Sequence, residues 1–384
     1  MEPIYLDYAA TTPMRKEVRE AMSRMDAERF GNPSSVHRWG REARAALEEA
    51  RARLAKLIGA SPVEIVFTRG GTEADNLAVL GRARAFPHQP IVCSAIEHRA
   101  VLSAARAAEA EGHPLHILPV NAAGVVEVAE LDQFLDPKPA VVSVMWVNNE
   151  VGTVQPIREL AERCRAAGVV FHTDAIQAFG KFPVRVDEVP VDLLSISAHK
   201  IGGPKGVGLL YVRRGTELSP IIYGGSHEHG MRAGTEDVAG AVGFATAAEL
   251  WVRDLAEQSR RIAELRDRLE TGLRERIPDL VVNGGGATRA PNILSVSLPG
   301  VNTETLVVTL DLEGFAVSSG SACSSGAVTP SHVLTEMGVP DEVAGPTVRF
   351  SLGRETTSEE IDRVIATLPT VVERMRALAV FEAD

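Results

Sequence analysis

An alternation of apolar, strand-like runs with helical segments between Glu64 and Val212 constrains the fold of this chain more than any other feature. The runs are rich in Val, Ile and Leu, and they fall at residues 64–68, 90–95, 115–120, 140–147, 169–173, 191–197 and 207–212. Ala- and Arg-rich segments of helical period lie between several of them, such as residues 99–111 and 157–167. Apolar strands that alternate with helices favour a mostly parallel sheet with helices on each side. We therefore predict an α/β fold, with ligands bound beyond the carboxyl ends of the strands.

The rest of the chain predicts further helices and a second, smaller domain. Residues 36–58 have the pattern of a long helix, and residues 239–277 form a helical tract that we expect to lead out of the large domain. From Asn292 the pattern reads strand, helix, strand, strand and helix, at residues 293–298, 305–312, 315–318, 347–352 and 358–377. The length of 384 residues also favours two domains. We predict a large domain of residues 13–256 and a smaller α+β domain of residues 1–12 and 257–384.

Charge and cysteine content exclude several classes of function. Lys and Arg number 40 and Asp and Glu number 51, so the formal net charge of −11 argues against broad nucleic-acid or anionic-membrane binding. The apolar runs fall short of the roughly 18 residues that a membrane span needs. The three cysteines include no CxxC pair, which excludes a disulfide framework and a four-thiolate zinc site and indicates a reducing compartment. The first residues show no basic or apolar leader pattern, so we expect a cytoplasmic protein.

A glycine turn predicts an anion-binding site. Gly70 and Gly71 follow a predicted strand, and a predicted helix follows them. Glycines let backbone amides approach an anion, the helix N-terminus adds a positive dipole, and Thr72 offers a hydroxyl. A tight strand-to-helix turn with Thr72 as N-cap would explain the same residues. The chain has neither a G-x-G-x-x-G nor a G-x-x-x-x-G-K-[ST] pattern, so dinucleotide and P-loop sites have no support.

Two strand ends carry ionisable residues. Lys200 follows the strand at 191–197, where burial would lower its pKa and suit it to form a Schiff base, although a surface lysine would also explain it. Asp174 follows the strand at 169–173, where it needs a cationic partner, either a protonated pyridine nitrogen or a nearby Arg or Lys. A phosphate turn, an acid and a lysine in this order on a parallel sheet meet the needs of pyridoxal 5'-phosphate. The glycine turn, the acid and the lysine together indicate this cofactor more specifically than any one of them does alone.

A series of ordered motifs extends over nearly the whole chain, from YLDYAATTP at residues 5–13 to the final helix. The others are FGNPSSVH at 30–37, TRGGTE at 68–73, EHRAV at 97–101, VNNEVG at 147–152, HTDAIQ at 172–177, SAHK at 197–200, MRAGT at 231–235, SSGSAC at 318–323 and RFSLGR at 349–354. With these motifs the chain resembles the NifS/IscS-type cysteine desulfurases, fold-type I pyridoxal-phosphate enzymes of the class-V aminotransferase family. The resemblance implies a homodimer, with a mostly parallel seven-stranded sheet in each large domain.

The resemblance also implies roles for the matching residues. Lys200 would carry the cofactor as a Schiff base, Asp174 would pair with its ring nitrogen, and His98 would lie over the ring as a proton carrier. Gln177 would contact the phenolic oxygen of the cofactor, and Asn149 would contact the same region and the substrate. Arg354 would bind the substrate carboxylate. The cofactor phosphate would be held by Gly71, Thr72, Ser197 and His199, together with Thr235 from the other subunit. A guanidinium suits the carboxylate better than an ammonium does.

Cys323 is the predicted sulfur carrier. Its neighbours are Ser, Gly and Ala, which predict a solvated loop, while Cys93 and Cys164 have the surroundings of small core residues. The resemblance implies that the Cys323 thiolate attacks the sulfur of L-cysteine, giving a persulfide and L-alanine. We predict no resident metal, although Cys323 could transiently ligate a cluster on a scaffold partner.

The predicted function is therefore that of a cysteine desulfurase, which passes sulfur to an iron–sulfur scaffold or to a tRNA or cofactor thiolation enzyme. A selenocysteine lyase would share the cofactor residues and stays an alternative, as does another class-V aminotransferase-like enzyme, although a transaminase has no need of the thiol at Cys323. The complete set of Lys200, Asp174, Cys323 and Arg354 argues against a regulatory subunit without turnover. Two departures from the family pattern are Arg69, where Ser is usual, and a short segment after Arg354, which in longer form docks a scaffold in some members.

Overall fold

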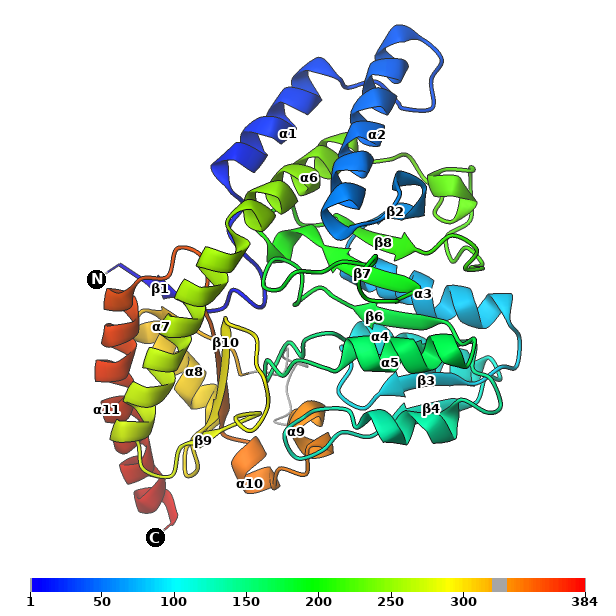
Figure 1. Cartoon of the computed structure of the whole chain (residues 1–384). Coiled ribbons are helices and arrows are strands. Elements are labelled where there is room, and N and C mark those ends of the chain that lie inside the picture. The colour runs from blue at the N-terminus through cyan, green and yellow to red at the C-terminus, as the bar shows by residue number, and fades with distance from the viewer. Residues whose placement is uncertain (1, 320–329, 384) are drawn as a thin grey trace.

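A seven-stranded sheet forms the centre of the protein (Figure 1). The computed structural model describes residues 2–319 and 330–383. The strand order is β2 (Ile65–Thr68), β8 (Gly208–Val212), β7 (Leu193–Ser197), β6 (Phe171–Asp174), β5 (Val141–Ser143), β3 (Ile91–Ser94) and β4 (Leu115–Leu118). Strand β8 is antiparallel to both of its neighbours, β2 and β7, and every other pairing is parallel. The prediction of a mostly parallel seven-stranded sheet is confirmed.

Helices cover both faces of this sheet, as the apolar character of its strands requires. In β8, Leu209 and Tyr211 pack in the large core cluster with α2 (Arg38–Ile58) and α5 (Ile157–Ala166). The alternate residues Leu210 and Val212 pack on the other face against α3 (Gly71–Ala85), and α4 (Arg99–Ala110) covers the same face nearby. Because side chains alternate along a strand, each strand contributes to two cores. Helix α6 (Val238–Arg253) packs against both α2 and α1 (Lys16–Glu28).

A smaller group of elements lies at one end of the large sheet (Figure 1). It contains an antiparallel sheet in the order β12 (Thr347–Ser351), β10 (Ile293–Ser297) and β9 (Val281–Val282). Strand β1 (Ile4–Tyr5) pairs in parallel with β11 (Phe315–Ala316), so the first residues of the chain join this group. The helices here are α7 (Leu255–Arg276), α8 (Thr303–Leu312), α9 (His332–Glu336), α10 (Asp341–Ala344) and α11 (Ser358–Ala383). The domain boundaries at residues 12 and 256 stay a prediction.

The helical tract predicted at residues 239–277 is two helices in the structure. Helix α6 ends at Arg253 and α7 begins at Leu255, because Asp254 leaves the helical conformation with φ −108° and ψ 14°. The Asp254 carboxylate accepts hydrogen bonds from Arg253 and Arg354. The break between α6 and α7 therefore lies where Asp254 contacts Arg354, which follows β12. No helix in the described residues is long and apolar enough to cross a membrane.

Candidate active site

A cavity of about 470 Å³ opens beyond the carboxyl ends of the parallel strands. Strands β6 and β7 end at Asp174 and Ser197, and both residues line it. Its wall includes most of the residues that the sequence predicted for the site: Gly71, Thr72, His98, Asn149, Asp174, Gln177, Ser197, His199 and Lys200. Asp7, Asp75 and Arg349 line the same cavity without having been predicted. The fold thus brings together these residues from seven separate segments, as parallel sheets do at this edge.

The N-terminus of α3 forms one end of the cavity. Gly70 is the N-cap, with a φ of 136° that favours glycine, and no side chain caps the helix. Thr72 is therefore not the N-cap, and its exposed side chain is available for another contact. A Cβ atom on Gly71 would lie 2.0 Å from Ile176 Cδ1, so a larger residue at this position would need the Ile176 side chain to shift. The amides at the start of a long helix, with Ser197 and His199 beside them, make this end suitable for a phosphate.

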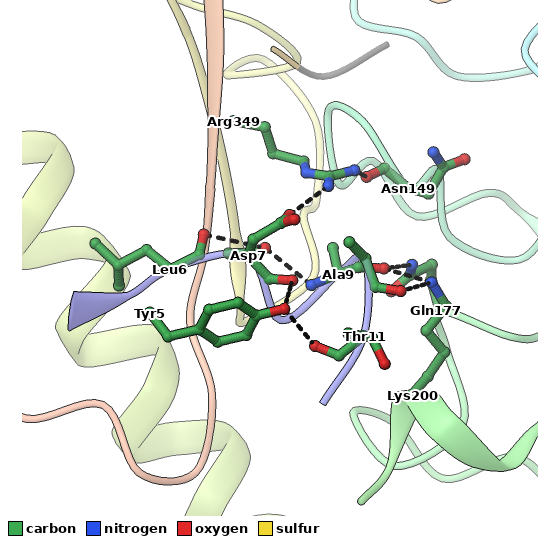
Figure 2. Close-up of polar contacts among 11 residues, drawn as sticks. Tyr5, Leu6, Asp7, Ala9, Thr11, Asn149, Gln177, Lys200 and Arg349 are labelled. Carbon is green, nitrogen blue, oxygen red and sulfur yellow. Dashed lines mark hydrogen bonds and ion pairs between the residues drawn. The ribbon is translucent and has the colours of Figure 1, made fainter. Parts of the chain in front are cut away.

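Lys200 reaches the cavity from the short helical turn that follows β7. Its Nζ donates hydrogen bonds to the backbone carbonyls of Ala9 at 2.6 Å and Ala10 at 2.8 Å, as Figure 2 shows. Burial and the nearby Arg349 guanidinium lower the pKa of Lys200 to about 8. The neutral fraction of this amine near neutral pH is therefore larger than that of an ordinary lysine, which favours formation of a Schiff base.

Asp174 lines the cavity at the end of β6 and is only 4% exposed. Its Oδ1 accepts a hydrogen bond of 2.8 Å from the Ile176 amide, and burial raises its pKa to about 6. Among the described residues, no Arg or Lys forms an ion pair with this carboxyl. The alternative in which Asp174 pairs with a protein cation is therefore not what the structure shows.

Gln177 and His98 complete the polar wall. The Gln177 amide nitrogen donates to the Ala9 carbonyl at 2.9 Å, while its Oε1 is buried without a hydrogen-bond partner. His98 is the N-cap of α4 and accepts a hydrogen bond from the Ala100 amide through Nδ1 at 3.1 Å. Burial and the nearby Lys200 lower the pKa of His98, so its ring is neutral and its Nε2 carries the proton. Both side chains therefore have capacity for a further contact.

The two arginines of the RFSLGR motif lie in different places. Arg354 pairs with Asp254, stacks 5.8 Å from the Trp251 ring centroid and lines a neighbouring, much smaller cavity. Arg349 instead lines the main cavity, where Nη1 donates to the Asn149 carbonyl at 2.8 Å and Nη2 to Asp7 Oδ1 at 2.7 Å. Because Lys200 also lines the smaller cavity, Arg354 lies near the lysine, and its predicted contact with the substrate carboxylate stays a prediction. Sequence reasoning missed Arg349 because it lies within a buried strand, although its place in a shared motif was the available signal.

Thr235 and Cys323 are the predicted residues that remain to be described. Thr235 is exposed, outside the lining residues, and its role in the pocket of a second subunit stays a prediction. Cys323 lies outside the described residues. Cys93 and Cys164 are both fully buried within the core clusters, in β3 and α5 respectively. Within residues 2–319 and 330–383, no group of His, Cys, Asp and Glu side chains could hold a metal ion.

Comparisons with known proteins agree with this geometry. The model of the aminotransferase class-V family matches residues 4–364. A cysteine desulfurase IscS from Dictyoglomus turgidum is 46% identical over 383 residues, which are 99% of this chain and 97% of that protein. A solved NifS-like protein has a TM-score of 0.91 and 36% identity, with 97% of this chain and 99% of that one covered. A structure of SspA in complex with cysteine has a TM-score of 0.82 and 34% identity, with 92% and 100% covered.

Proposed function

The chain belongs to the aminotransferase class-V family, and from this premise we propose that it is a pyridoxal-phosphate-dependent cysteine desulfurase. The observation that carries the proposal is the cavity that Lys200 and Asp174 both line, together with residues at the N-terminus of α3. The relatives named as cysteine desulfurases, and the cysteine bound in the SspA structure, support L-cysteine as the substrate.

The residues of the cavity fit pyridoxal 5'-phosphate. The amides of α3, with Thr72, Ser197 and His199, would hold the phosphate, and the Lys200 amine would link to the aldehyde. The unpartnered Gln177 Oε1 belongs to an amide that can turn toward the ring substituents, and Asp174 lacks the cation that a protonated ring nitrogen would supply. When bound, this cofactor supplies an electron-accepting ring that stabilises negative charge at the substrate Cα.

Arg349 is the group that we assign to the substrate carboxylate. It is 5% exposed, lines the cavity, and its Nε has no hydrogen-bond partner in the described structure. The Asn149 carbonyl and the Asp7 carboxylate hold the other two nitrogens, so the guanidinium plane is oriented before substrate binds. A planar, pre-oriented guanidinium binds a carboxylate with little loss of side-chain entropy.

Lys200 Nζ and His98 Nε2 are the proton-handling atoms of the proposed reaction. The neutral Lys200 amine would take the proton from the substrate Cα, and His98 would return a proton as the carbon–sulfur bond breaks. The Cys323 thiolate would form the new sulfur–sulfur bond. The balance is one L-cysteine and one thiol giving one L-alanine and one Cys323 persulfide. The persulfide would pass to an acceptor such as an iron–sulfur scaffold or a thiolation enzyme.

Replacement of the proposed sulfur carrier tests this function. Cys323→Ser should keep the visible absorbance of the bound cofactor, yet release no sulfide and little alanine from L-cysteine with a thiol reductant. Cys164→Ala is the matched control, because Cys164 is buried in the core away from the cavity, and it should retain turnover. Full desulfurase turnover by Cys323→Ser would show that another group receives the sulfur.

A further inference from the structure

A second lysine is buried beside the one that reaches the main cavity. Lys181 is 8% exposed, lines the smaller cavity and not the main one, and takes no part in the proposed reaction. Among the ion pairs of the described residues, none includes Lys181. Its Nζ lies 5.7 Å from the Trp251 ring centroid, and an aromatic face stabilises a cation without an acid. A lysine so deeply buried without a carboxylate partner is uncommon and calls for a structural reason.

The contact that accounts for this burial is with the backbone of Lys200. Lys181 Nζ donates a hydrogen bond of 3.0 Å to the Lys200 carbonyl. The carbonyl of Ala198, at the start of the same short turn, accepts from the backbone amides of Ile201 and Gly203. The Lys200 carbonyl instead takes its donor from a side chain. Removal of that donor would leave a backbone acceptor without this partner, which is costly away from water.

The backbone around Lys181 packs directly on the turn that carries Lys200. Gly180 has a φ of 79°, and a Cβ atom on it would lie 2.6 Å from Ile201 Cγ2. A glycine therefore allows this close approach in a conformation that other residues rarely adopt. Ser259 Oγ donates to the Lys181 carbonyl at 2.8 Å, which ties the same segment to α7. Lys181 is thus held in place independently of its own amine.

The N-terminal segment holds the turn through a different set of contacts. The backbone amide of Thr12 donates to the His199 carbonyl at 3.0 Å, and its Oγ1 donates to the same carbonyl at 2.6 Å. The Gly202 amide in turn donates to Thr12 Oγ1 at 2.7 Å. Thr12 therefore holds the carbonyl before Lys200 and an amide after it, while Lys181 holds the carbonyl of Lys200 itself.

We propose that Lys181 is a positioning residue, whose amine holds the Lys200 carbonyl and so fixes the turn from which the Lys200 amine reaches the main cavity. The inference rests on the proposed function for the role of Lys200 in the reaction. Neutral and charged lysine amines both carry N–H donors, so this hydrogen bond forms in either protonation state. Precise placement of the Lys200 amine matters, because a displacement of about 1 Å can lower a reaction rate about a hundredfold.

Two substitutions separate the donor from the bulk of the side chain. Lys181→Met is similar in length and has no donor, whereas Lys181→Arg keeps donors and can extend into the adjoining cavity of about 20 Å³. In holoenzyme, we expect Lys181→Met to lower kcat about tenfold with KM within about twofold, because Lys181 lies outside the main cavity and acts only through Lys200. Lys181→Arg should recover most of kcat. Equal losses in both variants would overturn the proposal.

Ser259→Ala is the matched control for a local disturbance. It removes the hydrogen bond to the Lys181 carbonyl but leaves the donor on Nζ, so kcat should stay within about twofold of the parent. A loss of kcat as large as that of Lys181→Met would mean that packing of this segment, and not the contact with Lys200, is what matters, and would overturn the proposal.

Hydrogen exchange of the cofactor-free, full-length protein measures the turn itself. In Lys181→Met the amides of Ile201, Gly202 and Gly203 should exchange about tenfold faster, because the turn opens more often without its side-chain donor. Lys181→Arg and Ser259→Ala should keep the parent rates. Unchanged exchange in Lys181→Met, or an equal acceleration over the whole large sheet, would overturn the proposal. The measurement uses neither cofactor nor activity, so its outcome stands even if the protein proves not to be a desulfurase.

Discussion

Arg349 and Asp7, which lie 342 positions apart in the chain, form an ion pair of 2.7 Å between Nη2 and Oδ1 at the wall of the cavity. Figure 2 shows the Arg349 guanidinium between Asp7 and Asn149, next to the segment whose carbonyls hold Lys200. The pair joins the first residues of the chain to β12, and it fixes the direction of the guanidinium. This orientation supports the proposed contact of Arg349 with a substrate carboxylate.

Arg349→Lys should raise the KM for L-cysteine by about tenfold or more, since an ammonium cannot reproduce the planar two-point contact with a carboxylate. The matched control is Arg354→Lys from the same motif. Arg354 pairs with Asp254 outside the main cavity, so its replacement should leave KM within about twofold. Steady-state kinetics of alanine formation measure KM for both variants. A larger increase of KM in Arg354→Lys than in Arg349→Lys would show that Arg354 binds the substrate carboxylate.

The rate of cofactor loading should rise with pH through about 8. Only the neutral Lys200 amine attacks an aldehyde, and the pKa of Lys200 is lowered to about 8, so the reactive fraction grows as pH passes that value and then levels off. The return of visible absorbance after mixing cofactor-free protein with pyridoxal 5'-phosphate measures the rate. Lys200→Ala should show no such absorbance, whereas replacing the exposed Lys205 by Ala should change nothing. A loading rate independent of pH would contradict this assignment.

Cys93 and Cys164 should resist alkylation in the folded protein. Burial raises the pKa of the Cys164 thiol to about 12 and raises that of Cys93 further, so neither forms the reactive thiolate near neutral pH. Mass spectrometry after iodoacetamide treatment should find both sites modified only once the protein is unfolded in urea. Modification of either in the folded protein would show that the core opens there.

The buried ion pair between Arg51 and Glu228 should be a major contributor to stability. Arg51 donates to both oxygens of Glu228 at 2.7 and 2.8 Å and to the Ile65 carbonyl, while Glu228 also accepts from the Phe67 amide at 2.8 Å. Arg51→Met leaves Glu228 as an uncompensated buried charge, so we expect the free energy of unfolding to fall by about 3–5 kcal/mol.

Urea denaturation measures this loss. The exposed pair of Arg38 and Glu42 is the control, and Arg38→Met should produce no measurable change. The double change of Arg51→Met with Glu228→Gln should recover part of the loss, because no charge is then left unpaired. A double variant no more stable than Arg51→Met would show that the charge is not the cause.

Local patterns were sufficient to predict the elements of the large sheet and several residues of the site. The strands are short and apolar on both faces, which left little ambiguity about a covered parallel sheet. Lys200 and Asp174 were predictable because each lies at or shortly after the end of an apolar strand, where a charged residue contrasts with its surroundings. Short elements such as β1 and β9 carry no periodic signal of their own and were not predicted.

Local sequence patterns could not predict that Arg349 and Asp75 line the cavity. Arg349 interrupts a five-residue buried strand, and only its contact with Asp7, from the other end of the chain, shows that it faces the cavity. Asp75 sits in a helix whose other buried residues are mostly apolar, and only the position of β6 below it reveals the second carboxyl nearby. Contacts between distant segments decide both cases, because the charge of a buried group depends on what surrounds it in space.

The sequence alone determined that this chain builds a helix-covered parallel sheet with a phosphate turn, an acid and a lysine at the carboxyl ends of its strands. These properties follow from periodicity and from the position of each residue relative to its own strand or helix. Only the tertiary structure decided that Arg349 lines the main cavity while Arg354 pairs with Asp254, and that the Asp75 carboxyl is buried. Those outcomes depend on packing between residues far apart in the chain, which sets the burial and the partners that determine where a charge is stable.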